Sequence, residues 1–208
     1  MIFDDRSDAG ERLAIALAQW RGKHALILAI PRGAVPMGAI VAERLGGDLD
    51  VVLTRKLGAP GNPEFAIGAV DESGWTYMAN HAESTGATRE YIEREVAAQL
   101  ETMRRRRAQY TPARAPLDPA GRIAIVVDDG LATGATMITA LHSVAAKQPQ
   151  RLVCAVPVGA REAVERVRPH ADDVVCLDPS MEFFAISQCY RSFPQVDDDE
   201  VVAILQQH

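Results

Sequence analysis

The chain alternates short, continuous runs of apolar residues with longer stretches in which apolar side chains recur at every third or fourth position. Continuous runs of this length predict buried β-strands, and the longer recurrence predicts helices with one apolar face. The predicted strands cover residues 25–30, 49–54, 123–127, 151–156 and 173–177. The predicted helices between them cover residues 35–45, 135–147 and 160–168. This α/β order predicts an open parallel sheet with helices on both faces and right-handed crossovers.

Three further helices are predicted outside this alternation. The first begins at Ser7 or Asp8, near the start of the chain. The second covers residues 88–109 and ends in four arginines, Arg104–Arg107. Positive charge suits a helix C-terminus, so we interpret this run as a solvated helix end rather than a binding patch. The third begins with the acidic residues 197–200.

The composition fits one compact domain, because 48% of the 208 residues are hydrophobic and 24% are charged. A net charge of -6 disfavours an overall affinity for nucleic acid or anionic lipid. No apolar run approaches the length of a membrane span and no targeting pattern precedes the first helix, so a cytoplasmic protein is expected. The three cysteines lack metal-ligand spacing, and Cys154 and Cys176 fall in predicted strands, which favours buried thiols.

The stretch IVVDDGLATGAT, residues 125–136, places Asp128 and Asp129 between a predicted strand and a small-residue loop that opens a predicted helix. Backbone N–H groups of such a loop bind anions. The sequence of the loop lacks the Gly-Lys-Ser/Thr ending of a Walker loop and the spaced glycines of a dinucleotide site. Carboxylates accept hydrogen bonds from a vicinal diol. The stretch therefore predicts a ligand with a phosphate at one end and a diol at the other, as in a ribose 5-phosphate.

The same stretch resembles the binding signature of the type I phosphoribosyltransferases, in which two acids follow a strand and precede a loop that ends in Thr-Gly-x-Thr. The resemblance implies that Asp128 and Asp129 bind the ribose hydroxyls of phosphoribosyl pyrophosphate (PRPP). It implies that the 5'-phosphate is held by the loop residues Ala132, Thr133, Gly134, Ala135 and Thr136. It also implies a single domain, residues 1–208, with a small hood beside the core. We place the core at about 22–70 and 120–178 and the hood at about 71–117 and 179–208.

A pyrophosphate site is expected at the end of a second strand of the same sheet. The stretch AIPRGAVPMG follows the first predicted strand and opens a helix. It resembles the pyrophosphate loop of the family, which implies binding roles for Arg32 and Gly33 and a cis peptide between Pro31 and Arg32.

Arg55 and Lys56 follow the second predicted strand and precede a segment rich in glycine and proline, residues 58–63. The composition of that segment predicts a mobile surface loop. The arrangement resembles the flexible lid of the adenine-type members, which implies that Arg55 and Lys56 take up pyrophosphate charge. We expect Lys56, together with Asp128 and Asp129, to act in catalysis.

The resemblance implies transfer of the ribose 5-phosphate group of PRPP to a nitrogenous acceptor, a nucleobase or a similar molecule, with release of pyrophosphate. Mg²⁺ is expected to arrive bridged to PRPP oxygens, without a dedicated metal site on the protein. Most members are dimers, so a homodimer is expected. The alternative is a non-catalytic PRPP-binding regulator on the same fold. A nucleotide-binding oxidoreductase is disfavoured by the missing glycine pattern.

The identity of the acceptor is left open by the sequence. The 6-oxopurine members carry an acid in the phosphate loop where this chain has Ala132, which speaks against hypoxanthine or guanine. Glu64 is a candidate for proton transfer, although a solvated surface glutamate is the simpler interpretation. Phe183, Phe184 or Tyr190 could stack on a flat acceptor, with a role in the core as the alternative.

Overall fold

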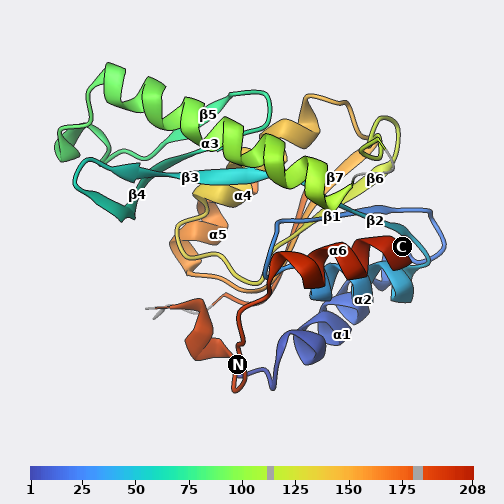
Figure 1. Ribbon diagram of the computed structural model, residues 1–208. Helices are drawn as coiled ribbons and strands as arrows, with labels where there is room; N and C mark the ends of the chain where they lie inside the picture. Colours follow the sequence, from blue (N-terminus) through green and yellow to red (C-terminus); the bar gives the residue numbers. More distant parts are fainter. Residues whose placement is uncertain (112–114, 180–184) are drawn as a thin grey trace.

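A five-stranded parallel sheet forms the centre of the computed structural model, which describes residues 1–111, 115–179 and 185–208 (Figure 1). The strands lie in the order β2-β1-β6-β7-β8. They are β1 (Leu26–Ala29), β2 (Asp48–Val51), β6 (Ile123–Val127), β7 (Arg151–Val158) and β8 (Asp173–Asp178). Each predicted strand has its counterpart in this sheet, and every pair is parallel. The predicted α/β fold is therefore confirmed.

Helices cover both faces of the sheet because successive side chains of a strand point to opposite sides (Figure 1). Ile27 and Val127 belong to an apolar core shared with α1, α2 and α6, whereas Leu28 and Val126 belong to a second core shared with α4 and α5. The helices are α1 (Arg6–Ala16), α2 (Val35–Leu45), α4 (Ala135–Ala145), α5 (Arg161–Val167) and α6 (Asp198–Gln207). Short 3-10 helices cover Ala18–Trp20, Glu83–Thr85, Arg168–His170 and Ile186–Cys189.

A second sheet, antiparallel and three-stranded, forms the hood beside the parallel sheet (Figure 1). Its strands are β3 (Thr54–Ala59), β4 (Asn62–Asp71) and β5 (Thr76–Met78). The helix α3 (Arg89–Tyr110) and the core helix α4 both contact β3 and β4. The antiparallel sheet begins at Thr54, so residues 54–70, which we expected in the core, lie outside the parallel sheet.

The segment predicted as a mobile loop, residues 58–63, is the tip of the β3–β4 hairpin. Pro60 and Gly61 alone connect the two strands, and Gly61 has a φ of 73°. Proline followed by a glycine with positive φ is a preferred order for a turn of this length. The connection is therefore a tight turn within paired strands, not the longer surface loop that we expected, while its mobility stays a prediction.

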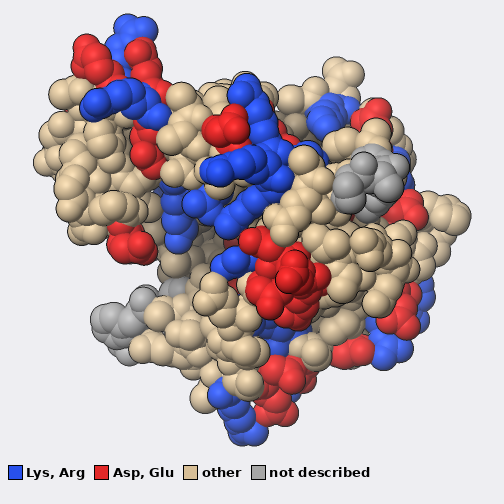
Figure 2. Space-filling model, viewed as in Figure 1, with Lys and Arg blue, Asp and Glu red and all other residues tan. Residues whose placement is uncertain are grey.

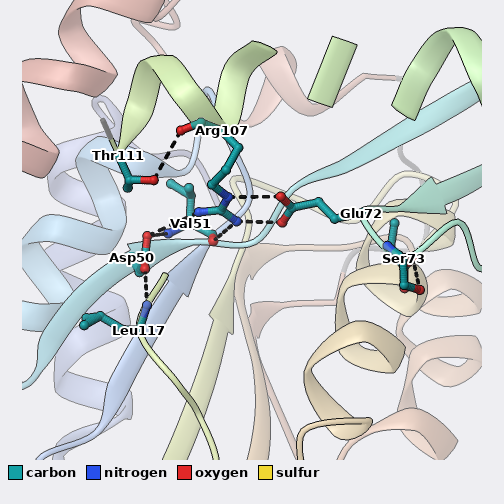
Figure 3. A network of polar contacts seen from close by, with 8 residues as sticks. Asp50, Val51, Glu72, Ser73, Arg107, Thr111 and Leu117 are labelled. Atoms are coloured by element: carbon teal, nitrogen blue, oxygen red, sulfur yellow. Dashed lines mark hydrogen bonds and ion pairs between the residues drawn. The ribbon is translucent and has the colours of Figure 1, made fainter. Parts of the chain in front are cut away.

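The helix α3 is fastened to the core through Arg107 (Figure 3). Arg107 donates to the carboxylate of Glu72 (2.6 and 3.0 Å) and to the carbonyl of Val51 (3.1 Å). Its guanidinium also lies 3.6 Å from the buried carboxylate of Asp50. The prediction of a solvated helix end holds for Arg104, whose side chain is 76% exposed, but not for Arg107, which is 17% exposed. In the described part of the chain, α3 included, no helix has the length and apolar character to cross a membrane.

The N-terminal segment pairs with residues that lie near the other end of the chain. Phe3 donates its N–H to the carbonyl of Cys189 (2.8 Å), and Arg191 donates to the carbonyl of Phe3 (2.9 Å). The helix α1 follows directly, with Asp5 as its N-cap, so it begins earlier than the predicted Ser7 or Asp8. This pairing brings Arg6 and the segment after β8 to the same edge of the parallel sheet.

The cysteines are free thiols. Cys154 is fully buried in β7, and burial raises its pKa. Burial also raises the pKa of Cys176 to about 11. Both thiols are therefore protonated near neutral pH. The expectation of a buried thiol is confirmed for Cys154 but not for Cys176, which is partly exposed.

Candidate functional site

The candidate site lies where β1 and β6 end, in the middle of the parallel sheet. From β1 the chain turns to β2 on one side, and from β6 it turns to β7 on the other side. In open α/β sheets, ligands bind in the crevice at such a change of direction. The N–H of Ile30 donates to the carbonyl of Val127 (2.9 Å), so the ends of the two strands lie side by side. The two sequence motifs that follow these strands therefore meet at one place.

A pocket of about 220 Å³ opens at these strand ends. Asp128, Asp129 and the loop that follows them line one side, and Pro31 and Gly33 line another. Lys56 reaches the same pocket from the hood strand β3. The predicted phosphate-loop residues in its wall are Ala132, Thr133, Gly134 and Thr136. The fifth, Ala135, lines a neighbouring pocket of about 280 Å³ under the hood, which also contains Thr133.

The loop between β6 and α4 is suited to an anion. Gly134 is the N-cap of α4 with a φ of 82°, a left-handed conformation that favours glycine, and no side chain caps the helix. The N–H of Ala135 makes a long hydrogen bond to Oγ1 of Thr133 (3.4 Å). The next N–H groups have no acceptor within the helix, so they are available to a ligand at this end. Arg166 of α5 donates to the carbonyl of Thr133 (2.7 Å) and so fixes the loop from behind.

Asp128 and Asp129 are ionisable groups in an unfavourable environment. Burial and the neighbouring charge of Asp129 raise the pKa of Asp128 well above its ordinary value. Burial also raises the pKa of Asp129, although Arg6 opposes this effect. Asp128 accepts a hydrogen bond from the backbone N–H of Asp129 (2.9 Å) through Oδ1. No described residue donates to its Oδ2, which leaves that atom for a ligand.

Two side chains hold Asp129 in place: Arg6, for which the sequence showed no sign of a role, and Tyr190, named above for stacking or a core position. Arg6 donates to Oδ2 of Asp129 through Nε and Nη2, both at 3.2 Å. The hydroxyl of Tyr190 donates to the backbone carbonyl of Asp129 (2.7 Å). Tyr190 is only 6% exposed, so it belongs to the core and does not stack on a ligand. The local sequence holds no signal for either contact, because both partners are distant along the chain.

Gly33 is in direct contact with the same carboxylate. A Cβ atom at this position would lie 2.2 Å from Oδ2 of Asp129 and 3.2 Å from Nη2 of Arg6. Only the absence of a side chain lets the two motifs approach so closely. The peptide between Pro31 and Arg32 is cis, as the family resemblance implied.

The three predicted pyrophosphate-binding cations do not converge. Lys56 lines the pocket, but Arg55 donates to Gln99 of α3 (2.8 Å), since neighbouring residues of a strand point to opposite faces. Burial and the charges of Arg106 and Arg32 lower the pKa of Arg55. Arg32 lies 3.5 Å from Asp198 of α6.

The surface around Arg55 carries both signs of charge. Figure 2 shows lysine and arginine side chains gathered over the C-terminal part of α3, beside acidic side chains over the start of α6.

The aromatic candidates Phe183 and Phe184 lie outside the described residues. Glu64 is exposed on β4 and is absent from the pocket wall.

The chain matches the family model described as "Phosphoribosyl transferase domain" over residues 4–192. In an alignment of 210 positions that covers 98% of this chain, it is 43% identical to proteins from two strains of Mycobacterium tuberculosis. The names of these proteins assign them provisionally to the phosphoribosyl transferases. The chain spans about half the length of these curated relatives (46%). The crystal structure of protein TT1426 from Thermus thermophilus has a TM-score of 0.83 and 46% identity, covering 100% of this chain and 99% of that chain.

Proposed function

The chain belongs to the phosphoribosyl transferase domain family, and on this premise we propose that it transfers the ribose 5-phosphate group of PRPP to a nitrogenous acceptor. The leaving group is pyrophosphate. Because the chain covers 46% of the curated relatives' length, the proposal concerns the reaction of this domain and no other part of a longer protein.

One observation carries the proposal: a pair of carboxylates and an anion-binding loop share a single small pocket. Asp128 and Asp129 each present one oxygen to which no described side chain donates, which suits the two hydroxyls of a ribose. The uncapped start of α4 suits the 5'-phosphate. A sugar that carries a phosphate at its 5' end satisfies both halves of the pocket at once.

The proposed reaction breaks the bond between C1 of the ribose and a pyrophosphate oxygen and forms a bond between C1 and the acceptor nitrogen. Positive charge develops on the ribose ring as the old bond lengthens. Asp128 and Asp129, held next to the ring, would stabilise that charge in a site shielded from solvent. Correct positioning of the two reactants accounts for about 7 to 11 kcal/mol of the barrier in favourable cases.

Lys56 is the pocket cation proposed to bind the leaving pyrophosphate, with the backbone at Gly33, whereas Arg32 lines the adjoining recess. Among the described residues, no group of three His, Cys, Asp or Glu side chains could hold a metal ion. Mg²⁺ would be carried mainly by the oxygens of PRPP, with few or no direct ligands from the protein. When bound, the ion would neutralise charge on the pyrophosphate.

The test is an incubation of the protein with PRPP, Mg²⁺ and a panel of acceptors: adenine, 6-oxopurines, pyrimidines and small amines. Pyrophosphate release and the mass of the product are recorded. We expect release that depends on one acceptor class and that disappears in the double variant Asp128→Asn with Asp129→Asn. Thermal unfolding of the double variant checks that its fold is intact.

Two other outcomes would count against the proposal in different ways. Binding of PRPP with no acceptor-dependent product across the panel would favour the non-catalytic regulator. No detectable binding of PRPP would remove the assignment of the pocket itself.

A further inference from the structure

Arg6 is the most heavily engaged charged side chain next to the pocket. Besides its two bonds to Asp129, it donates through Nη1 to the carbonyl of Pro194 (2.6 Å) and lies over the ring of Phe193, with Cζ 3.7 Å from the centroid. Its side chain is 10% exposed and that of Asp129 is 13% exposed. All three guanidinium nitrogens and one of its faces therefore have partners, so its position is closely determined.

Arg6 reaches Asp129 from the side opposite to the ligand pocket. It is absent from the pocket wall, and it lines a separate recess of about 330 Å³ together with Arg32 and Phe193. Asp129 and Gly33 separate the pocket from the recess, because each of these residues lines the pocket on one side and the recess on the other. Arg6 can therefore act on a ligand only through Asp129.

The two bonds from Arg6 go to the same carboxylate oxygen, Oδ2. Oδ1 of Asp129 receives no hydrogen bond from any described side chain. With Oδ2 held by Arg6 and pressed against Gly33, the carboxylate cannot rotate freely, which leaves Oδ1 as the oxygen for a ligand. A guanidinium is suited to this task because its donors form a rigid, planar fork.

We propose that Arg6 is a positioning residue, which orients Asp129 so that its Oδ1 accepts a hydrogen bond from a ribose hydroxyl of PRPP. The inference rests on the proposed function, since it concerns the same pocket. It adds a residue from the first helix of the chain, outside both of the motifs that line the pocket.

The charges around Asp129 explain why a cation is needed behind it. Asp128 and the phenol of Tyr190 face Asp129 from the sheet and from the C-terminal segment, and Lys56 faces it from the hood. Arg32 lines the recess on the far side. Burial favours the protonated carboxyl, which would be a poorer acceptor, and Arg6 lowers the pKa of Asp129 against that tendency.

The test compares PRPP affinity as a function of pH for wild type, Arg6→Met and Arg6→Lys, measured by calorimetry with Mg²⁺ present. Arg12→Met is the matched control: Arg12 lies on the same helix, pairs with Asp8 (2.8 Å) and lies over the ring of Phe3 (5.3 Å), but it does not touch the pocket. Thermal unfolding of each variant reports on its fold.

We expect Arg6→Met to weaken PRPP binding by roughly ten- to a hundredfold, the range for residues that orient a ligating group from behind. Removal of the cation raises the pKa of Asp129 further, so affinity should be lost at a higher pH as the solution is acidified. Ionisation of PRPP itself is common to all the proteins, so the difference between the profiles belongs to the protein. Arg6→Lys should keep the wild-type midpoint but bind less tightly, because an ammonium group lacks the planar fork.

A double-mutant comparison separates positioning from a general effect on the fold. If Arg6 acts through Asp129, Arg6→Met should cause no further loss of affinity in an Asp129→Asn background. The inference is overturned if wild type binds PRPP and Arg6→Met has the affinity and pH profile of Arg12→Met. Should Arg6→Met not fold, wild-type affinity in Arg6→Lys would overturn it equally. Absence of PRPP binding by wild type would instead refute the proposed function.

Discussion

Substitution of Gly33 by alanine tests the contact between the two motifs directly. The added Cβ would lie 2.2 Å from Oδ2 of Asp129, whereas ordinary contacts begin at 3.4 Å, so the carboxylate must move by more than 1 Å. Such a movement breaks its bonds to Arg6, which are already 3.2 Å long. Gly33 does not have a positive φ, so alanine introduces a steric effect without backbone strain.

The expected loss can be worked from the bonds at stake. A hydrogen bond to a charged group contributes about 1.5 to 3 kcal/mol, and about 1.4 kcal/mol corresponds to a factor of ten in affinity. Gly33→Ala should therefore weaken PRPP binding by about ten- to a hundredfold, measured by calorimetry at pH 7.5. Overpacking should also lower the free energy of unfolding by about 1 to 3 kcal/mol.

Gly47→Ala is the matched control for this prediction. Its added Cβ would lie 2.3 Å from the carbonyl oxygen of Ala25, at the amino end of the parallel sheet and away from the pocket. It should lose stability through a clash of similar size and retain its affinity for PRPP. If Gly33→Ala binds PRPP within twofold of wild type, or loses no more affinity than Gly47→Ala, the contact between Gly33 and Asp129 has no role in binding.

Three further predictions concern residues whose environments differ sharply. Lys56→Met should weaken PRPP binding by at least about tenfold, measured by calorimetry. The loss should exceed that of Arg55→Met, because Lys56 lines the pocket while Arg55 binds Gln99. Equal losses of affinity would contradict this assignment. Arg107→Met should lower the free energy of unfolding in urea by about 3 kcal/mol, since it removes the partner of buried and half-buried carboxylates; the exposed Arg104→Met should change it by less than about 0.5 kcal/mol. Asp128→Asn should raise the thermal stability of the free protein at pH 8. Because the pKa of Asp128 is raised in the folded protein, wild type loses stability as the pH rises through that pKa. The stability advantage of Asp128→Asn should therefore shrink toward pH 4. A difference in stability that stays constant with pH would be evidence against the raised pKa.

The sequence predicted the features that depend on neighbouring residues. The period and length of the apolar runs were sufficient to predict all five strands of the parallel sheet. Strands buried on both faces require a continuous apolar run, although β8 is partly exposed along its length. The turn between β6 and α4 was also predictable, since its small residues, its glycine and the helix that follows are contiguous. The location of the candidate site, at the carboxyl edge of the sheet, followed from the rule that parallel strands present their carboxyl ends together.

The hood was less predictable from local signals. Pro60 and Gly61 occur in loops and in tight turns alike, and only the pairing of β3 with β4 distinguishes the two. Once the segment is a strand, its alternation sends Lys56 to the pocket and Arg55 to α3. The arginines at the end of α3 also differ in their environments. Arg107 is covered by β2 and Glu72, whereas Arg104 remains exposed to solvent.

The sequence alone determined the order of strands and helices, the position of the acids and the small-residue loop that follows them. Tertiary structure alone decided which side chains surround the acids. Arg6 and Tyr190 lie 123 and 61 residues from Asp129 along the chain, and they reach it only because the first residues pair with the segment after β8. A charge partner at such a distance leaves no periodicity or motif, because the energy that selects it exists only once the chain has folded.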